Sequence, residues 1–170
     1  MPAGAAIDLG GIGKGYAADL VSLDLIRAGA TGAMVDIGGD LVVRGTPAVG
    51  ERWIVGVQDP TDPPRLIASV ALVLGGLATS GTTVRRWRSP TGETVHHLID
   101  PSTAMPSTTS LLTATVVAAD VATAEVFATA AMMHDGPQAV ELIEAVGLAG
   151  LFVTRDGGVL RTRSLRAFSP

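Results

Sequence analysis

Cysteine is absent from this chain of 170 residues. Its absence excludes disulfide bonds, zinc–thiolate sites and a cysteine nucleophile. Charged residues are also scarce at 16%, the net charge is −4, and there is no long run of basic residues. Proteins that hold nucleic acid through its phosphates need clustered Lys and Arg, so we expect no nucleic-acid partner.

Long apolar runs are missing apart from residues 111–133, which contain Asp120 and Glu125. Two carboxylates inside a membrane span would be costly, so this stretch predicts a buried strand followed by a buried helix, and no membrane-spanning segment. The N-terminus has no charged region followed by an apolar one. No signal peptide is therefore visible, and the sequence leaves the compartment open.

Apolar residues make up 47% of the chain, which is typical of one globular domain with its own core. Apolar spacing and turn residues predict three helices, over residues 14–28, 119–133 and 137–147. The predicted strands cover residues 5–9, 33–37, 41–44, 53–58, 68–74, 77–80, 94–99, 112–118, 150–154 and 159–163. Turns are expected at Gly75-Gly76 and around Gly157. Strands outnumber helices and several are joined as hairpins, so the predicted class is α+β.

The first candidate site is a Gly-rich turn, Asp8 to Gly15, that leads into a helix. Glycines let backbone amides approach an anion, the helix start adds partial positive charge, and Lys14 suits a phosphate. The spacing matches neither the complete dinucleotide fingerprint nor the P-loop. A tight strand-to-helix turn with a solvated Lys14 remains an alternative of similar weight.

Two further motifs follow strands. Gly38-Gly39-Asp40 comes after an apolar strand and, by itself, favours a hairpin turn. Ala78 to Gly81 precedes the segment His96 to Pro101. One of the two histidines could face a ligand and act as a base, since imidazole titrates near neutral pH. The alternative is an ordinary pair of strand histidines, one pointing inward and one outward.

The last candidate is a carboxylate and a hydroxyl on one helix. Glu125 and Thr129 are four residues apart, so they share a helical face. Their oxygens suit a hard cation such as magnesium. The commoner alternative places Glu125 on the polar edge of an amphipathic helix. Its neighbours are small or apolar, however, and a buried carboxylate would need a partner.

In this order and spacing, these blocks resemble the ApbE family of FAD:protein FMN transferases. The family pattern runs D-L-G-G-I-A-K-G-Y, G-G-D, W-x-V-G-I-x-x-P, A-T-S-G, H-I-I-D-P-x-T-G-x-P and A-D-x-x-x-T. The corresponding segments here are Asp8 to Tyr16, Gly38 to Asp40, Trp53 to Pro60, Ala78 to Gly81, His97 to Pro106, and Ala124 to Thr129. The resemblance covers essentially the whole chain. It implies the family's T-fold-related α+β fold, with residues 1–170 forming the C-terminal part of that domain.

The resemblance also implies a function. FMN would pass from FAD to a Thr or Ser hydroxyl of an acceptor flavoprotein, with magnesium as cofactor and AMP as the leaving product. By position, Asp8, Lys14, His97 and Ile99 would contact FAD. Magnesium would be held by three residues, namely Gly11, Glu125 and Thr129. His97 would be the catalytic base. No acceptor-like D-x-x-T-G-A-T or D-x-x-S-G-A-T segment occurs here, so self-modification is not expected.

The chain departs from the family pattern at several points. Glu125 stands where Asp is usual, Ala128 where some members carry a second Asp, and Ala104 where Gly is usual. The resemblance further implies that the family's N-terminal half, with its lipoprotein signal, has no counterpart in these 170 residues. Two alternatives follow: a relative that binds or hydrolyses FAD without transferring FMN, and an inactive fragment.

Overall fold

A computed structural model describes residues 2–170, and it confirms the α+β class. Its centre is a six-stranded sheet in which every neighbouring pair of strands is antiparallel. The strands lie in the order β1 (Gly32–Ile37), β2 (Asp40–Gly45), β5 (Gly75–Gly81), β10 (Leu111–Ala118), β11 (Ala149–Thr154) and β12 (Val159–Arg161).

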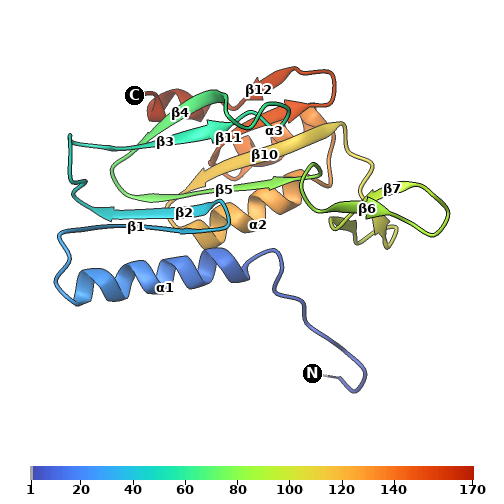
Figure 1. Ribbon diagram of the computed structural model, residues 1–170, viewed down its shortest axis with the longest axis horizontal. Coiled ribbons are helices and arrows are strands. Elements are labelled where there is room, and N and C mark those ends of the chain that lie inside the picture. Colours follow the sequence, from blue (N-terminus) through green and yellow to red (C-terminus); the bar gives the residue numbers. More distant parts are fainter. Residues whose placement is uncertain (1) are drawn as a thin grey trace.

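The two faces of the sheet are covered differently (Figure 1). Three helices pack on one face: α1 (Gly13–Arg27), α2 (Val121–Ala131) and α3 (Gly136–Ala145). The other face carries the hairpin of β3 (Trp53–Gln58) and β4 (Leu66–Leu72), together with the short 3₁₀ helix η1 (Arg163–Phe168). The sheet is therefore the middle layer of the molecule, and both of its faces are available to form core.

Short strands form the end of the molecule that projects to the right in Figure 1. They are β6 (Arg86–Arg88) paired with β7 (Thr94–His96), and β8 (Ile99–Asp100) paired with β9 (Met105–Pro106). These pairs lie outside the main sheet. They carry the His97 segment to the end of β5 and so form one wall of the site described below.

Apolar side chains fill both sides of the sheet. Leu72 of β4 and Leu151 of β11 belong to the cluster between the hairpin and the sheet, and Phe152, Met132 and Ile143 belong to the cluster on the helix side. Each is at most 1% exposed. Burying a side chain of this size contributes about 1.5–3 kcal/mol. This core fixes the relative positions of β5, β10 and α2, from which several site residues project.

Helix α1 approaches α2 unusually closely. A Cβ added to Gly15 would lie 2.6 Å from the carbonyl oxygen of Val121, so only glycine fits there. Asp19 accepts hydrogen bonds from the backbone N–H groups of Val121 and Ala122 at the start of α2, and it also pairs with Arg44. The buried face of α1 is consequently made of small and polar residues. The larger apolar residues that predicted this helix, including Tyr16 and Leu20, are exposed instead.

Several local predictions were wrong. Residues 5–9 form no strand. The strand predicted at residues 77–80 is confirmed as part of β5, which is an interior strand of the main sheet. Gly75-Gly76 is the start of β5 and not a turn. A Cβ on Gly76 would lie 2.5 Å from the Cβ of Val121, so this glycine allows the sheet to meet α2.

The segment from Thr94 to Ile99 was predicted as one strand but is divided in two. The chain bends at His97 and Leu98, where the Leu98 N–H donates to His96 Nδ1 and the Ser107 N–H donates to the Leu98 carbonyl. The loop predicted after it contains β9. The hairpin of β11 and β12 around Gly157 is confirmed. Within residues 2–170, no helix is both long and apolar enough to cross a membrane.

Candidate functional site

The Gly-rich turn ends at the first residues of α1, and its helix start binds a carboxylate of the protein itself. The N–H groups of Ile12 and Gly13 donate to the Leu9 carbonyl and close the turn. The Gly15 N–H then donates to Oε2 of Glu125 over 2.7 Å. A carboxylate is favoured at this position because the first N–H groups of a helix carry partial positive charge. The anion-binding turn predicted from the sequence therefore binds Glu125.

Lys14 lies between two buried carboxylates. Its Nζ is 2.7 Å from Oε1 of Glu125 and also contacts Oδ2 of Asp40. Both carboxylate side chains are 2% exposed, whereas that of Lys14 is 35% exposed. Burial alone would lower the pKa of Lys14, but hydrogen bonds and charge attraction to the two carboxylates hold that pKa above its ordinary value. Lys14 is thus a charged cation at neutral pH and is already paired.

Asp40 is a site residue that its sequence motif did not reveal. Gly38 and Gly39 form the predicted hairpin turn between β1 and β2, both with positive φ. Asp40 begins β2 and points into the site instead of into solvent. Burial raises the pKa of Asp40, and the hydrogen bond from Lys14 acts in the opposite direction.

The three predicted metal ligands lie close together. Thr129 follows Glu125 by one turn of α2, and its Oγ1 is 3.0 Å from Oγ of Ser80 on β5. Gly11 faces the same hydroxyl, since a Cβ added to Gly11 would be 3.7 Å from Thr129 Oγ1. The fold therefore brings a carboxylate, two hydroxyls and the turn backbone to one place.

The two histidines differ in burial because His96 ends β7, whereas His97 lies in the bend that follows it. His96 is buried and its Nε2 lies 3.0 Å from the Ser107 carbonyl oxygen, which is a structural role. His97 is exposed and faces the pocket that contains Lys14. Partial burial lowers the pKa of His97, and the positive charges of Arg85 and Lys14 act in the same direction, against an interaction with the Arg85 backbone. His97 is therefore suited to be a neutral base.

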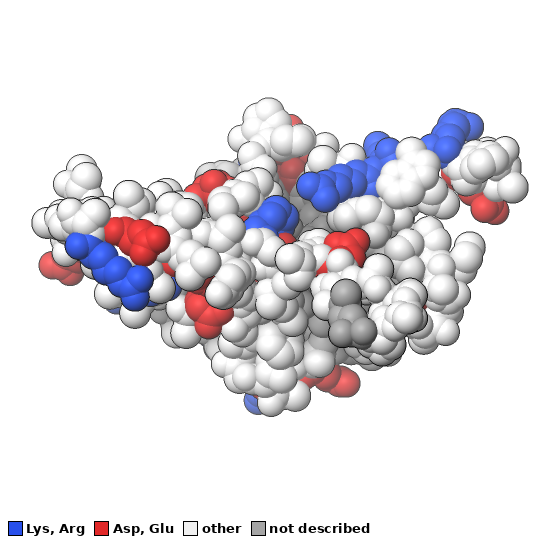
Figure 2. Space-filling view, turned by 90° about the horizontal axis from the view of Figure 1, so that it is seen from below, with Lys and Arg blue, Asp and Glu red and all other residues white. Residues whose placement is uncertain are grey.

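Lys14, His97, Glu125 and Thr129 line one cavity of about 210 Å³. Its lining comes from six separate segments: Gly10 with Lys14, Gly38, residues 79–81 with 83–85, His97-Leu98, Thr113, and Glu125 with Thr129. Figure 2 views the helix side of the molecule and shows a hollow bordered by basic and acidic side chains. A larger cavity of about 610 Å³ shares part of this lining and continues along Ile54 to Pro60 of the β3 region.

Three predicted site residues do not line the 210 Å³ cavity: Gly11, Asp8 and Ile99. Gly10 of the turn lines it in place of Gly11. Asp8 is exposed, and its Oδ1 accepts a hydrogen bond from the Gly10 N–H. Ile99 is exposed on β8, while its neighbour Leu98 contributes to the wall. Sequence reasoning also missed Arg85, which lines the cavity. Its position four residues after the Ala78 to Gly81 motif was the available signal.

The site is a set of mixed oxygen donors and not a cluster of acidic or histidine side chains. Within residues 2–170, no group of three or more His, Asp or Glu side chains is arranged to hold a metal ion. The donors near Thr129 are instead one carboxylate, hydroxyls and backbone. Hard oxygen donors of this kind suit magnesium, which keeps several waters and binds through only one or two carboxylates.

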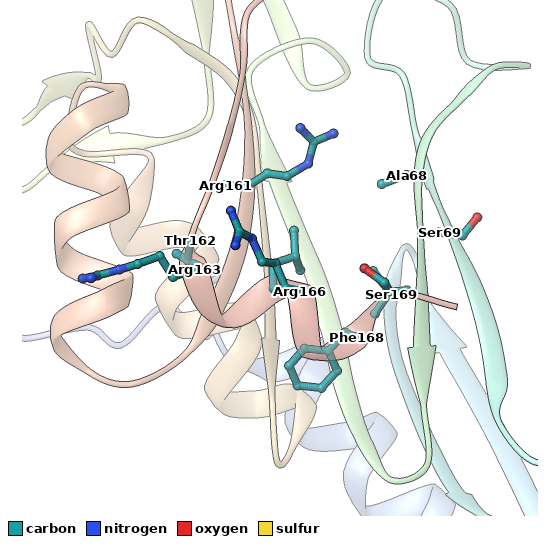
Figure 3. A pocket seen from close by; sticks show the side chains of 10 residues that line it. Ala68, Ser69, Arg161, Thr162, Arg163, Arg166, Phe168 and Ser169 are labelled. Carbon is teal, nitrogen blue, oxygen red and sulfur yellow. The ribbon is translucent and has the colours of Figure 1, made fainter.

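A separate pocket lies between β4 and η1, on the other face of the sheet (Figure 3). Its labelled side chains include Arg161, Arg163 and Arg166. Arg163 points away toward α3, where it pairs with Glu144. None of the residues predicted for the site lines this pocket, so we assign the site to the cavity around Lys14.

Comparison with known proteins identifies the family. The sequence profile of the ApbE family matches residues 1–152. Proteins named FAD:protein FMN transferase from Klebsiella pneumoniae and Escherichia coli are each 32% identical over 157 residues, which is 92% of this chain. The chain spans 45% and 44% of their respective lengths, a little under half.

Solved structures give the same result. The ApbE protein of Thermotoga maritima superposes with a TM-score of 0.88 at 31% identity, over 96% of this chain and 53% of that one. The flavin transferase ApbE of Vibrio cholerae gives a TM-score of 0.79 at 26% identity, over 95% and 52%. The profile match over most of the sequence and the agreement of the folds lead to one conclusion: the chain belongs to the ApbE family.

Proposed function

We propose that residues 1–170 supply the metal-and-diphosphate part of a magnesium-dependent transferase that moves FMN from FAD to a Thr or Ser hydroxyl of an acceptor protein. The observation that carries the proposal is the convergence of Lys14, His97, Glu125 and Thr129 on one cavity. These residues are up to 115 positions apart in the sequence, from 14 to 129. The reaction is taken from the relatives, which are named FAD:protein FMN transferase.

The chemistry requires that one phosphorus–oxygen bond form and another break. The acceptor hydroxyl oxygen attacks the phosphorus on the flavin side of the FAD diphosphate. The bond from that phosphorus to the AMP oxygen breaks, and AMP leaves. His97 accepts the hydroxyl proton, a role that its lowered pKa and its position on the cavity wall favour. Atoms and charge balance without any redox partner.

Magnesium is proposed at Glu125, Thr129 and the Gly11 backbone. The Glu125 carboxylate already accepts from Lys14 and from the Gly15 N–H. An ionised carboxylate has about four acceptor positions, so two remain for a cation. When bound, the ion would neutralise charge that develops on the diphosphate. Glu125 and Thr129 would orient it, and Lys14 and Asp40 would fix the position of Glu125.

FAD is proposed to lie across the two adjoining cavities. The smaller one holds the polar residues, including Lys14 and His97, and suits the diphosphate. The larger one is lined by apolar side chains such as Ile54, Val57 and Leu66, and suits a flat ring. Asp8 and Ile99 are exposed and line neither cavity, and we propose that they contact parts of FAD outside both.

The test is the release of AMP from FAD by the 170-residue chain, measured by chromatography with and without magnesium. The acceptor is a protein that carries a D-x-x-T-G-A-T segment. We expect AMP together with flavin fluorescence that stays with the acceptor after denaturing electrophoresis. AMP and FMN formed without acceptor would instead support an FAD hydrolase, a candidate favoured by the replacement of an acidic residue at Ala128. Absence of both FAD binding and AMP release would refute the proposal.

A further inference from the structure

The charge balance of the small cavity differs from what the sequence suggested. Lys14 was expected to face a phosphate with a free positive charge. In the structure it is paired with both Asp40 and Glu125. The single ammonium is matched by two buried carboxyl groups, so it leaves no unpaired positive charge for a diphosphate. Lys14 therefore holds Glu125 in place, and an anionic ligand needs positive charge from another source.

Arg85 provides such a charge. It lies in the segment between β5 and β6 and lines the same cavity as Lys14, His97 and Thr129. Within residues 2–170, it is the only lining side chain besides Lys14 that is permanently cationic. Among the described residues, the guanidinium of Arg85 forms no ion pair, whereas those of Arg44 and Arg163 do. Arg85 is thus an unneutralised cation at a cavity whose other cation is already paired.

The chemistry of arginine suits a diphosphate. Guanidinium is planar and always charged, and it presents donors that match two phosphate oxygens at once. The charge of Arg85 also reaches His97, because it contributes to the lowered pKa of that imidazole. A diphosphate bound at Arg85 would therefore lie close to the candidate base.

We propose that Arg85 is the residue whose guanidinium binds the diphosphate of FAD, while Lys14 keeps Glu125 in position. This assignment rests on the proposed function and names a further binding residue for it. The ligand class is a nucleoside diphosphate, because Arg85 would contact the phosphates and not the rings.

Equilibrium binding of FAD, ADP and riboflavin to the 170-residue chain tests this proposal. The variant is Arg85→Gln, and the matched control is Arg86→Gln, an adjacent exposed arginine that lines a different cavity. Hydrogen bonds to charged groups are typically worth enough to change Kd about tenfold to a hundredfold. We expect R85Q to raise Kd for FAD and ADP by about tenfold or more. Riboflavin, which has no phosphate, should bind R85Q and the wild type equally.

Two additional measurements identify the cause. Binding of FAD to R85Q should depend less steeply on salt than binding to the wild type or to R86Q. Arg85→Lys should recover part of the affinity, since it restores charge without the two-pronged geometry. The urea midpoint of R85Q should match that of the wild type, because Arg85 is exposed and unpaired within residues 2–170.

The outcomes separate this assignment from the function on which it rests. Binding of FAD and ADP by R85Q with wild-type affinity would overturn the role of Arg85 and leave the proposed function standing. An equal loss of riboflavin binding would also overturn it, because the effect would then not concern the phosphates. Failure of the wild-type chain to bind either FAD or ADP would overturn both proposals together.

Discussion

Removing the ammonium of Lys14 should destabilise the protein in a pH-dependent way. The substitution Lys14→Met keeps most of the apolar stem but leaves Asp40 and Glu125 without their shared cation. Both carboxylates are 2% exposed, so neither can be solvated in place. Breaking a buried ion pair in this way typically costs about 3–5 kcal/mol. Because Lys14 itself is 35% exposed, water screens part of the interaction, and we expect a loss of about 2–3 kcal/mol.

The pH dependence follows from the two carboxyl groups. Burial already raises the pKa of Asp40, and Lys14 opposes that rise. Without Lys14, one of the two carboxyl groups should hold a proton in the folded state that the unfolded chain releases at neutral pH. The folded state then binds more protons than the unfolded state, so stability increases as pH falls. The gain should occur between the raised pKa and the ordinary carboxyl pKa of about 4.

Urea unfolding followed by far-UV circular dichroism, from pH 5 to pH 8, measures both effects. The matched control is Arg27→Met, which breaks the exposed pair between Arg27 and Asp24 and should cost little at any pH. The double variant Lys14→Met/Asp40→Asn removes the second charge as well. It should be more stable at pH 8 than Lys14→Met alone. The reasoning would be refuted if Lys14→Met lost no more stability than Arg27→Met, or if its loss were the same at every pH.

Three further predictions concern the surroundings of this cluster. Gly15→Ala should cost about 1–3 kcal/mol or more in urea unfolding, because its Cβ would meet the α2 backbone at 2.6 Å. The control Gly13→Ala in the same helix should be nearly neutral, because its Cβ would meet only a side-chain atom, at 3.3 Å. Similar losses of stability in the two variants would contradict the close contact between the helices. The rate of AMP release should fall only at a pH below the ordinary imidazole pKa of about 6.5, since the pKa of His97 is lowered and its neutral form persists to lower pH. His97→Gln should slow release about 10²–10⁴-fold and remove this acid limb, and an unchanged pH profile would exclude His97 as the base. Asp19→Ala should lower the free energy of unfolding by about 1–3 kcal/mol, because it removes the hydrogen bonds to the N–H groups at the start of α2. Asp24→Ala on the exposed side of α1 should not have this effect. Equal effects of the two variants on thermal unfolding would contradict a capping role for Asp19.

Much of the fold could be predicted because its signals are local. Helix α1, strand β10 and the hairpin at Gly157 follow from spacing and turn residues near in sequence. The predictions that failed depended on distant contacts. The pair Gly75-Gly76 has the composition of a turn, yet both glycines begin a strand that lies against α2 and the end of β10. The large apolar residues of α1 indicated a helix correctly, but its buried face was determined by how closely Gly15 approaches α2.

The candidate site shows the same difference between residues with local signals and residues that depend on distant contacts. Glu125 and Thr129 could be paired from sequence, because a separation of four residues places them on one helical face. The motif around Asp40 gave the correct turn and no indication that its carboxylate is buried. The sequence signalled Arg85 only by its position four residues after the Ala78 to Gly81 motif, and it precedes other exposed arginines. Its significance depends on which other residues line the cavity, and only the fold provides that information.

The role of Lys14 illustrates why a charge cannot be assigned to a ligand before its partners are counted. Its two carboxylates are 26 and 111 residues away in the sequence, so the Gly-rich turn alone could not reveal them. A substitution at Lys14 would abolish FAD binding whether the ammonium touches the diphosphate or only holds Glu125. The double variant Lys14→Met/Asp40→Asn tests whether the ammonium itself is needed. It removes the ammonium and one carboxylate together, so the lost positive charge is offset without restoring a cation. Recovery of FAD binding in this variant would show that Lys14 serves to offset the buried carboxylates and is not a phosphate ligand, whereas continued loss in a stably folded protein would show that the ammonium itself is required.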